Sequence, residues 1–363
     1  MQQTAAQVLG GSEFREDLRA PQGRQTQTQT QSQPRKILSA QELAPLTTLS
    51  DLRALWSLAI TLGMVVLAAA LSLWAWNQAV WGKLWLVPAC LWMAIAQHGL
   101  FILAHESAHY RLFSNRRIND VVGRLMGMAA GISMCTYRVI HRLHHNHLYG
   151  VQDPDTALHG GYPRGVAYLW KKILVDLSGF NAWKTFAYFF GSPAINTDTG
   201  VASRALDDTS PQLRADARRD RWAVVAFHVC VPVVLGITMG WQGVLAFAGL
   251  WWLPMLTFLQ PILRLRAICE HGAVTDTSSP MTAARSNRTH GAWMNWAGRF
   301  LLFPHHVNYH LEHHLYPAVP HYHLPALHRL LRDKGALDQA EVRDLQDTLR
   351  LIFAPKTPRT NHV

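Results

Sequence analysis

Histidines at short, repeated spacings are the residues of this sequence best suited to chemistry. The chain contains 20 His in 363 residues. Residues three and four positions apart share one face of a helix, so such spacings place imidazoles side by side. Three segments have this spacing: HESAH with His105 and His109, HRLHH with His141, His144 and His145, and HLEHH with His310, His313 and His314.

The stretches that must position these histidines are apolar enough to cross a bilayer. A membrane span needs about 20 apolar residues, and residues 54–76, 84–104, 222–239 and 243–263 each qualify. Only 16% of the chain is charged, whereas soluble domains have about 25% charged residues. The hydrophobic content of 49% excludes a chain that is disordered throughout. The predicted fold class is all-α: an integral membrane protein with four transmembrane helices in two hairpins and a cytoplasmic helical cap.

The charge distribution orients the hairpins. The net charge is +11, and residues 105–221 contain 15 Lys and Arg, whereas the two hairpin links contain only Lys83. Positive residues stay on the cytoplasmic side, so both termini and the middle segment are expected in the cytoplasm. Orientation thus explains the positive charge, and nucleic acid is not an expected partner.

The same topology places a further histidine, His271, on the side of the three clusters. It lies eight residues after the fourth span, so an even number of crossings separates all nine histidines. Nine imidazoles are too many for one zinc ion, which takes about four ligands. They suit two metal ions with four or five ligands each, although imidazole alone does not select the metal. None of the four Cys is spaced as CxxC, so neither a thiolate zinc site nor a redox pair is indicated.

The three histidine segments and their order resemble the membrane fatty acid desaturase and hydroxylase superfamily. RAICEHG (266–272) is similar to the RxxxEHG segment that follows the last span in many members. NYHLEHHLYP (308–317) is similar to the last histidine box of bacterial acyl desaturases, and DPD (153–155) is a common accompaniment of the second box. The resemblance covers roughly residues 50–335.

This resemblance implies a di-iron centre that uses O2 to remove hydrogen from lipid chains, with the nine histidines as ligands. The intact third box favours insertion of a double bond into the acyl chain of a membrane lipid. An alkyl C–H bond has no group on which acid–base catalysis can act, so a redox metal must carry out the removal of hydrogen. Because the chain has no Cys cluster and no haem domain, a separate ferredoxin, rubredoxin or small cytochrome is the expected electron donor. The expected location is the bacterial inner membrane.

Polar residues beside the histidine boxes are candidates to orient the ligands. A ligating imidazole commonly donates its second N–H to a carboxylate or carbonyl. Asn308 is also a candidate to complete a coordination sphere through water, and Glu312 is equally explained as an ordinary helix-pairing carboxylate. The candidates are Glu106, Asp153, Glu270, Asn308 and Glu312.

Histidines outside the boxes are expected to have ordinary roles. His98 and His228 lie within predicted spans and are expected to be buried and hydrogen-bonded. Five close to the boxes are expected beside the ligands rather than among them, namely His147, His305, His306, His321 and His323. Four more are expected at the surface, namely His159, His290, His328 and His362.

Three alternative functions stay open at this point. HESAH also fits the HExxH signature of a zinc metalloprotease, in which Glu acts as general base, but that site leaves seven of the nine histidines without a role. A metal transporter is disfavoured, because transporter sites lie near the bilayer midplane. Within the superfamily, a hydroxylase or ketolase acting on an alkyl, sterol, sphingolipid or carotenoid substrate uses the same boxes.

The remaining sequence predicts a tail, one main domain and a C-terminal segment. Residues 1–50, with the polar repeat TQTQTQSQ, are predicted to be a flexible tail. The desaturase-like domain is expected over 51–335, and a cytoplasmic helix with a tail over 336–363, the helix covering 338–353. Glycines at 123, 127 and 131 predict one short interfacial helix over 121–137 with a small-residue ridge.

Overall fold

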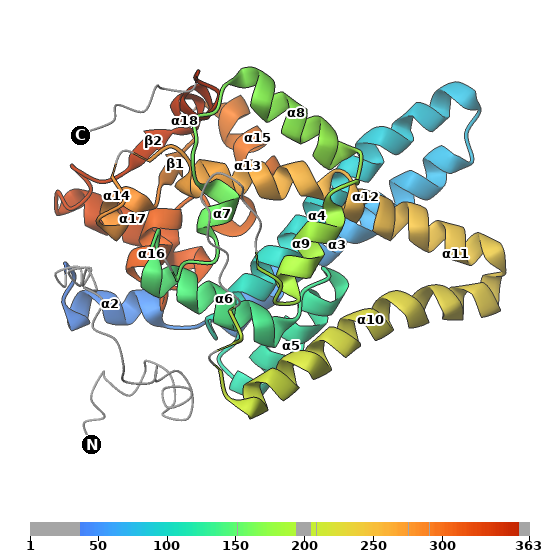
Figure 1. Ribbon diagram of the computed structural model, residues 1–363, viewed down its shortest axis with the longest axis horizontal. Helices are drawn as coiled ribbons and strands as arrows, with labels where there is room; N and C mark the ends of the chain where they lie inside the picture. Colours follow the sequence, from blue (N-terminus) through green and yellow to red (C-terminus); the bar gives the residue numbers. More distant parts are fainter. Residues whose placement is uncertain are drawn as a thin grey trace.

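The computed structural model describes residues 37–150, 152–193, 205–207, 209–274, 276–289 and 291–355. Within these residues the regular secondary structure is helical apart from one two-stranded sheet. Two helical hairpins extend from one side of a helical cap (Figure 1). The predicted all-α architecture is therefore confirmed except for this small sheet.

Four helical stretches are long and apolar enough to cross a membrane, as predicted. They are Asp51–Trp76, Val80–Ala108, Pro211–Met239 and Trp241–His271. Their elements are α3 (Asp51–Trp76), the 3₁₀ helix η2 (Val80–Trp85), α4 (Leu86–Ala108), α10 (Pro211–Met239), α11 (Trp241–Phe247), the π-helical turn η3 (Ala248–Trp252), α12 (Leu253–Leu256) and α13 (Leu259–His271).

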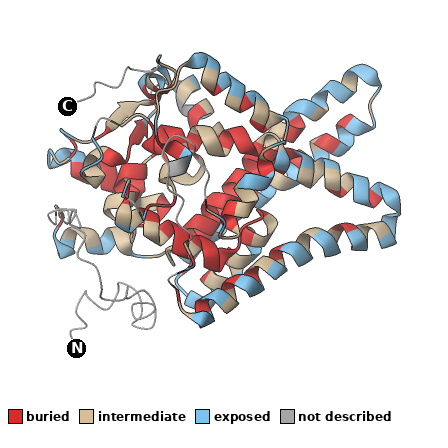
Figure 2. Cartoon of the chain, viewed as in Figure 1, coloured by how far each residue is buried: buried red, intermediate tan, exposed pale blue. Residues whose placement is uncertain are grey.

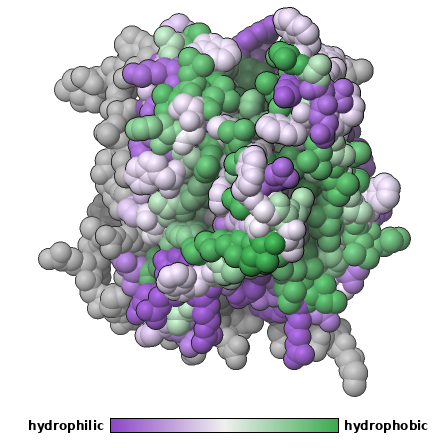
Figure 3. Space-filling model, turned by 90° about the vertical axis from the view of Figure 1, so that its right-hand side faces the viewer, coloured by the Kyte–Doolittle hydropathy of each residue, from purple (hydrophilic) through white to green (hydrophobic). Residues whose placement is uncertain are grey.

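The first hairpin is closely packed because α3 presents small residues to α4. The buried residues of α3 are all small, and small residues let helix backbones approach closely. They are Ala54, Ser57, Thr61, Ala68, Ser72 and Ala75. Away from the cap, the outer faces of the hairpins are largely exposed (Figure 2), and hydrophobic side chains cover much of the surface at their tips (Figure 3). These exposed faces have the apolar character that contact with lipid requires.

The second and fourth stretches carry their helices directly into the cap. Residues 93–107 of α4 are buried almost without interruption. The fourth stretch is irregular, with a π-helical turn and a break at Thr257, after which α13 continues to His271. The histidine segments that follow these spans in sequence are thus held by rigid helices rather than by loops.

The cap consists of short helices packed around the ends of α4 and α13. They are α2 (Ala40–Thr47), α5 (Arg116–Ala129), α6 (Met134–His147), α7 (Thr156–His159), α8 (Val166–Leu177), α9 (Ala182–Phe189), α14 (Pro280–Ala283), α15 (Ala292–Leu301), η4 (Pro304–His306), α16 (His310–Leu315), η5 (His321–His323), α17 (Leu324–Asp333) and α18 (Leu345–Ile352).

The prediction of one helix over 121–137 is wrong, because α5 and α6 are separate helices. Gly131 has a φ of 78°, a left-handed conformation that ends α5 and redirects the chain. The predicted small-residue ridge is confirmed. A Cβ on Gly123 would lie 1.8 Å from Oγ of Ser107, so only glycine permits this approach of α5 to α4.

The prediction of a helix over 338–353 is also wrong at its start. Strand β2 (Val342–Asp344) pairs in parallel with β1 (Ser286–Arg288), and only α18 beyond it is helical. The fully buried Arg285 pairs with Glu341, which anchors this segment as extended chain. At the other end, α2 lies within the stretch predicted to be a flexible tail, since Ser39 and Glu42 form a capping box. Residues 1–36 lie outside the described residues.

Candidate metal centre

The fold brings all nine predicted histidines together where α4, α6, α13 and α16 meet. They form two groups, and within each group the ligand atoms lie within 4.8 Å of one another. The first, here called the five-histidine group, contains His105, His109, His141, His145 and His313. The second, here called the four-histidine group, contains His144, His271, His310 and His314.

The five-histidine group has the nitrogen spacing of a metal site. Nε2 of His141 lies 2.8 Å from Nε2 of His109 and 3.0 Å from that of His145. Nε2 of His145 lies 3.1 Å from that of His313. Two nitrogens that bind one ion at about 2.1 Å with an angle near 90° lie about 3 Å apart. Both ring nitrogens of the buried His105 lack a hydrogen-bond partner among the described residues, so this imidazole has a nitrogen with which to bind a metal.

The four-histidine group has the same spacing around a second point. Nε2 of His271 lies 2.7 Å from that of His310 and 3.1 Å from that of His144. Nε2 of His314 lies 3.1 Å from that of His310. The ring of His314 also stacks on His145 of the other group, with 4.2 Å between ring centroids. The two groups are therefore adjacent, and their nitrogens fit two neighbouring metal ions.

The surroundings keep most of these imidazoles neutral, which is the form that binds a metal. Burial, and then repulsion by neighbouring histidines, hold the pKa values of His141, His145, His313 and His314 well below their usual range. Protonation of the cluster is costly because several imidazolium ions would be close together away from water.

Asp153 orients His144, as predicted of a carboxylate beside a ligand. Nδ1 of His144 and Oδ1 of Asp153 are 2.9 Å apart, which leaves Nε2 of His144 facing His271. Burial would raise the pKa of Asp153, but His144 and the N–H group of Tyr149 lower it to about 2. An ionised Asp153 fixes the imidazole tautomer and raises the basicity of Nε2.

Glu106 and Glu270 also lie beside candidate ligands, at longer distances. Oε1 of Glu106 lies 3.5 Å from Nδ1 of His105, and its Oε2 accepts the backbone N–H of His321 at 2.9 Å. Oε1 of Glu270 lies 3.7 Å from Nδ1 of His310 and accepts a hydrogen bond from Arg266 at 2.8 Å. Both carboxylates are buried next to the histidines they were predicted to orient.

Glu312 and Asn308 have different partners in the structure. Glu312 is fully buried, and its carboxylate binds His328 and the hydroxyl of Ser286. The side chain of Asn308 donates to the carbonyl oxygen of Asn287 at 3.1 Å. Among the described residues, neither makes a hydrogen bond to one of the nine histidines, and both link β1 to α16 or the residues just before it. Oδ1 of Asn308 is buried without a partner among the described residues, so its predicted role through water stays a prediction.

The sequence analysis missed His159, which was expected at the surface. His159 is 1% exposed and forms a third close group with His144 and Asp153. Its ring lies 4.7 Å from that of His271, between centroids. The signal that could have indicated this burial is the position of His159 on α7, which starts directly after Asp155. His328 was also expected at the surface but is buried against Glu312, whereas His290 and His362 lie outside the described residues.

Two tyrosines that the sequence analysis did not consider complete the walls. Tyr137 stacks on His141, with 5.4 Å between ring centroids and 10° between planes. The hydroxyl of Tyr149 donates to the carbonyl oxygen of His271. Nδ1 of His271 lies 3.1 Å from the carbonyl oxygen of Ala283, so the Tyr149 hydroxyl holds the backbone of this residue and a backbone carbonyl holds its ring.

Comparison with known families identifies this helical scaffold and its histidines. The chain matches the family model described as fatty acid desaturase over residues 83–345, which include all nine histidines. The chain belongs to the fatty acid desaturase family. This membership disfavours the zinc protease interpretation, because the HESAH histidines of this desaturase-family protein share their group with three further imidazoles.

Relatives of this desaturase-family chain come from plants and bacteria. It is 24% identical over 281 residues to an omega-3 fatty acid desaturase, chloroplastic, of Glycine max, covering 72% of this chain and 55% of the relative. An sn-2 acyl-lipid omega-3 desaturase (ferredoxin), chloroplastic, of Helianthus annuus is 24% identical over 285 residues, covering 73% and 58%. The sn-1 oleoyl-lipid 12-desaturase of Anabaena variabilis is 26% identical over 315 residues, covering 83% of each chain. The chain thus spans little more than half of these two plant relatives.

Proposed function

We propose that this member of the fatty acid desaturase family inserts a double bond into the acyl chain of a membrane lipid, using O2 and two iron ions. The observation that carries the proposal is the convergence of nine buried or half-buried histidines in two groups at the ends of membrane-spanning helices. The relatives named as acyl-lipid desaturases support a lipid-bound acyl chain as substrate.

In this proposal, each histidine group holds one iron ion. Bound iron supplies the one-electron and O2 chemistry that removal of hydrogen from an alkyl chain requires. The chain's own residues keep most of the ligands neutral, orient several of them and hold them away from water. Asp153 holds His144 in one tautomer, the carbonyl oxygen of Ala283 does the same for His271, and Glu106 and Glu270 lie beside His105 and His310.

The location of the site suits a substrate that stays in the membrane. The candidate ligands lie at the cap end of the spans, where an acyl chain can reach them from the bilayer. By the positive-inside rule this end faces the cytoplasm, and the inner membrane of a bacterium is the proposed location. A soluble donor of the ferredoxin, rubredoxin or small cytochrome type supplies the electrons. The ferredoxin named for the Helianthus relative supports the first of these.

Lipid profiling of a host that expresses the gene tests the proposal. Gas chromatography with mass spectrometry of total lipids is expected to show a new unsaturated acyl chain, absent from cells without the gene. Cells that express His313→Ala at the same level are the control and are expected to lack the product. If hydroxylated chains were the only new product, the reaction would be hydroxylation instead of desaturation. An unchanged lipid profile would contradict both reactions.

A further inference from the structure

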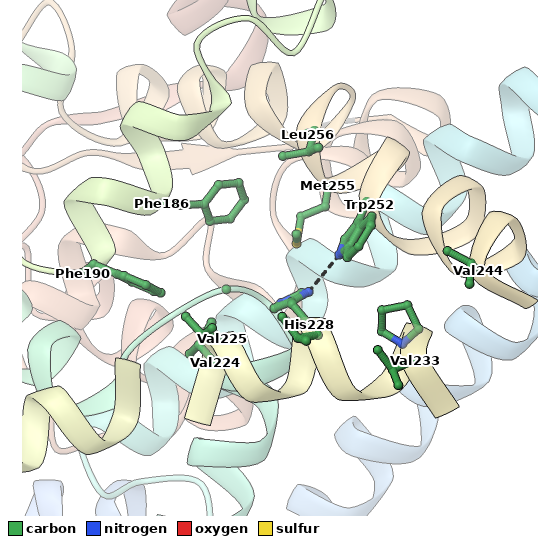
Figure 4. Close-up of a pocket in the computed structure, with 13 residues that line it drawn as sticks. Phe186, Phe190, Val224, Val225, His228, Val233, Val244, Trp252, Met255 and Leu256 are labelled. Atoms are coloured by element: carbon green, nitrogen blue, oxygen red, sulfur yellow. Dashed lines mark hydrogen bonds between the residues drawn. The ribbon is translucent and has the colours of Figure 1, made fainter. Parts of the chain in front are cut away.

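A groove between α9 and the two helices of the second hairpin lies apart from the histidine centre. Its volume is about 600 Å³, within the range of small-ligand pockets. Figure 4 shows Phe186 and Phe190 facing His228 of α10 across the groove, with Trp252 on another wall. None of the nine histidines lines it.

A basic pocket of about 650 Å³ adjoins this groove, and Phe190 lines both cavities. Three arginines of α10, Arg214, Arg218 and Arg221, line the basic pocket. Asp207 is the one carboxylate among its described lining residues. An apolar cavity therefore continues into a pocket with an excess of positive charge.

One face of α10 contributes residues to both cavities. Six of the α10 lining residues, beginning with Arg214, follow at intervals of four, three, four, three and four positions, which keeps them on one side of a helix. They are Arg214, Arg218, Arg221, Val225, His228 and Pro232. At a rise of 1.5 Å per residue this stripe is about 27 Å long, polar at one end and apolar at the other.

The stripe changes character at the expected membrane boundary. Trp222, 70% exposed, directly follows the last arginine, and exposed Trp side chains favour the membrane–water interface. Within the groove the one ionisable side chain, His228, is already satisfied. Its Nε2 lies 3.1 Å from the carbonyl oxygen of Met128, and its Nδ1 accepts a hydrogen bond from the Trp252 indole at 3.1 Å. The groove therefore offers an occupant apolar contacts only.

The arginines, in contrast, retain free donors. Arg218 is exposed and has neither an ion pair nor a hydrogen bond among the described residues. Arg221 uses one nitrogen to donate to the carbonyl oxygen of Phe190 at 2.7 Å, which holds it at the junction of the two cavities. Guanidinium groups bind phosphate oxygens through paired hydrogen bonds.

We infer that this composite site binds an anionic phospholipid, with one acyl chain in the groove and the phosphate at the arginine pocket. The inference goes beyond the proposed reaction, since the site is lined by none of the candidate iron ligands. It also gives the lipid a structural role. Phe186 of α9 and Phe190, which caps its C-terminus, line the groove, whereas Phe189 packs against Tyr137, the ring that stacks on His141. The bound lipid thus supports α9, which packs against one wall of the metal centre.

Native mass spectrometry of the purified full chain tests the inference by titration with palmitoyl-oleoyl phosphatidylglycerol. Phosphatidylcholine with the same chains, and glycerol 3-phosphate without chains, are separate arms. Phosphatidylglycerol is expected to bind at least tenfold more tightly than phosphatidylcholine, and glycerol 3-phosphate not measurably. Equal binding of the two lipids would overturn the inference, and so would binding of glycerol 3-phosphate as tight as that of the lipid, which indicates a free phosphate site.

Two matched pairs of variants locate the lipid. Arg218→Gln is expected to weaken phosphatidylglycerol binding about fivefold, since one basic residue near a lipid headgroup contributes about that factor. Arg219→Gln, its exposed neighbour outside the pocket, is expected to change binding less than twofold. Val233→Trp fills the groove and is expected to weaken binding tenfold, whereas the similarly exposed Val234 lies outside it and Val234→Trp is the control.

These variants test the lipid site independently of catalysis, because the measurement is lipid binding and needs no iron or product. Equal effects of Arg218→Gln and Arg219→Gln would show a diffuse electrostatic attraction and overturn the site. Equal effects of Val233→Trp and Val234→Trp would place the acyl chain elsewhere and overturn it as well.

Discussion

The two histidine groups of the metal centre are held in different ways. In the four-histidine group, the second nitrogens face fixed acceptors: Asp153 for His144, the Ala283 carbonyl oxygen for His271, and Glu270, more distantly, for His310. In the five-histidine group, a carboxylate lies near His105 alone, at 3.5 Å. Among the described residues, its other members are ordered by ring contacts with one another and, for His141, with Tyr137.

This difference indicates that ligand number and ligand orientation compensate each other. Four ligands leave little redundancy, and two of them, His144 and His271, are fixed by hydrogen bonds to their second nitrogens. Five ligands tolerate looser support, because the loss of one still leaves four imidazoles. The account therefore predicts that the four-histidine group depends on its surroundings, whereas the five-histidine group depends on packing.

Removal of one ligand from each group gives the largest expected effect. His271→Ala leaves three imidazoles and is expected to lose about one iron per chain, whereas His109→Ala leaves four and retains more of its iron. Both variants are expected to abolish the lipid product, since both irons are needed. Metal analysis of the two purified variants checks the difference, and equal iron loss would remove the distinction between the groups.

Removal of the orienting carboxylates gives the next largest effect. Asp153→Asn is expected to lower iron affinity or activity about 10- to 100-fold, the usual consequence of losing such a partner. Glu106→Gln removes a carboxylate beyond hydrogen-bond distance of His105 and is expected to have a smaller effect. The measurement is iron retained against increasing concentrations of a chelator. A larger loss for Glu106→Gln than for Asp153→Asn would reverse the comparison.

The smallest expected effect concerns packing around the five-histidine group. Tyr137→Leu removes the ring stacked on His141, and an aromatic contact contributes about 0.5–1.5 kcal/mol, or a few-fold in activity. Tyr137→Phe keeps the ring and serves as the control, with activity expected within about twofold of the parent. Product formation per expressed protein checks both variants. A large loss in the control would show that the hydroxyl, rather than the stacking, is the important feature.

The histidines of the candidate site could be predicted from sequence because helical spacing places those of each box on one face, and the order of the spans places the boxes and His271 on one side of the membrane. Even the division into groups has a local rule that the sequence analysis missed. Histidines four positions apart share a group, as His141 and His145 do, and His310 and His314 do. His144, although next to His145 in sequence, belongs to the other group, since adjacent residues point about 100° apart on a helix.

The surroundings of the site depend on contacts between distant segments, which spacing does not encode. The sequence around His159 gives no sign of burial, but this residue is buried because α7 packs against Asp153 and His271. Glu312 lies within the third box in sequence yet faces His328 and Ser286, because β1 lies behind α16. Similarly, residues 342–344 are extended rather than helical because β1 offers them a partner strand.

The central claim, that the two histidine groups form two iron sites, is tested most directly by metal analysis of the purified, detergent-solubilised chain. Inductively coupled plasma mass spectrometry of active protein is expected to give two iron per chain and no requirement for zinc. One metal ion per chain, or full activity with zinc in place of iron, would contradict the account.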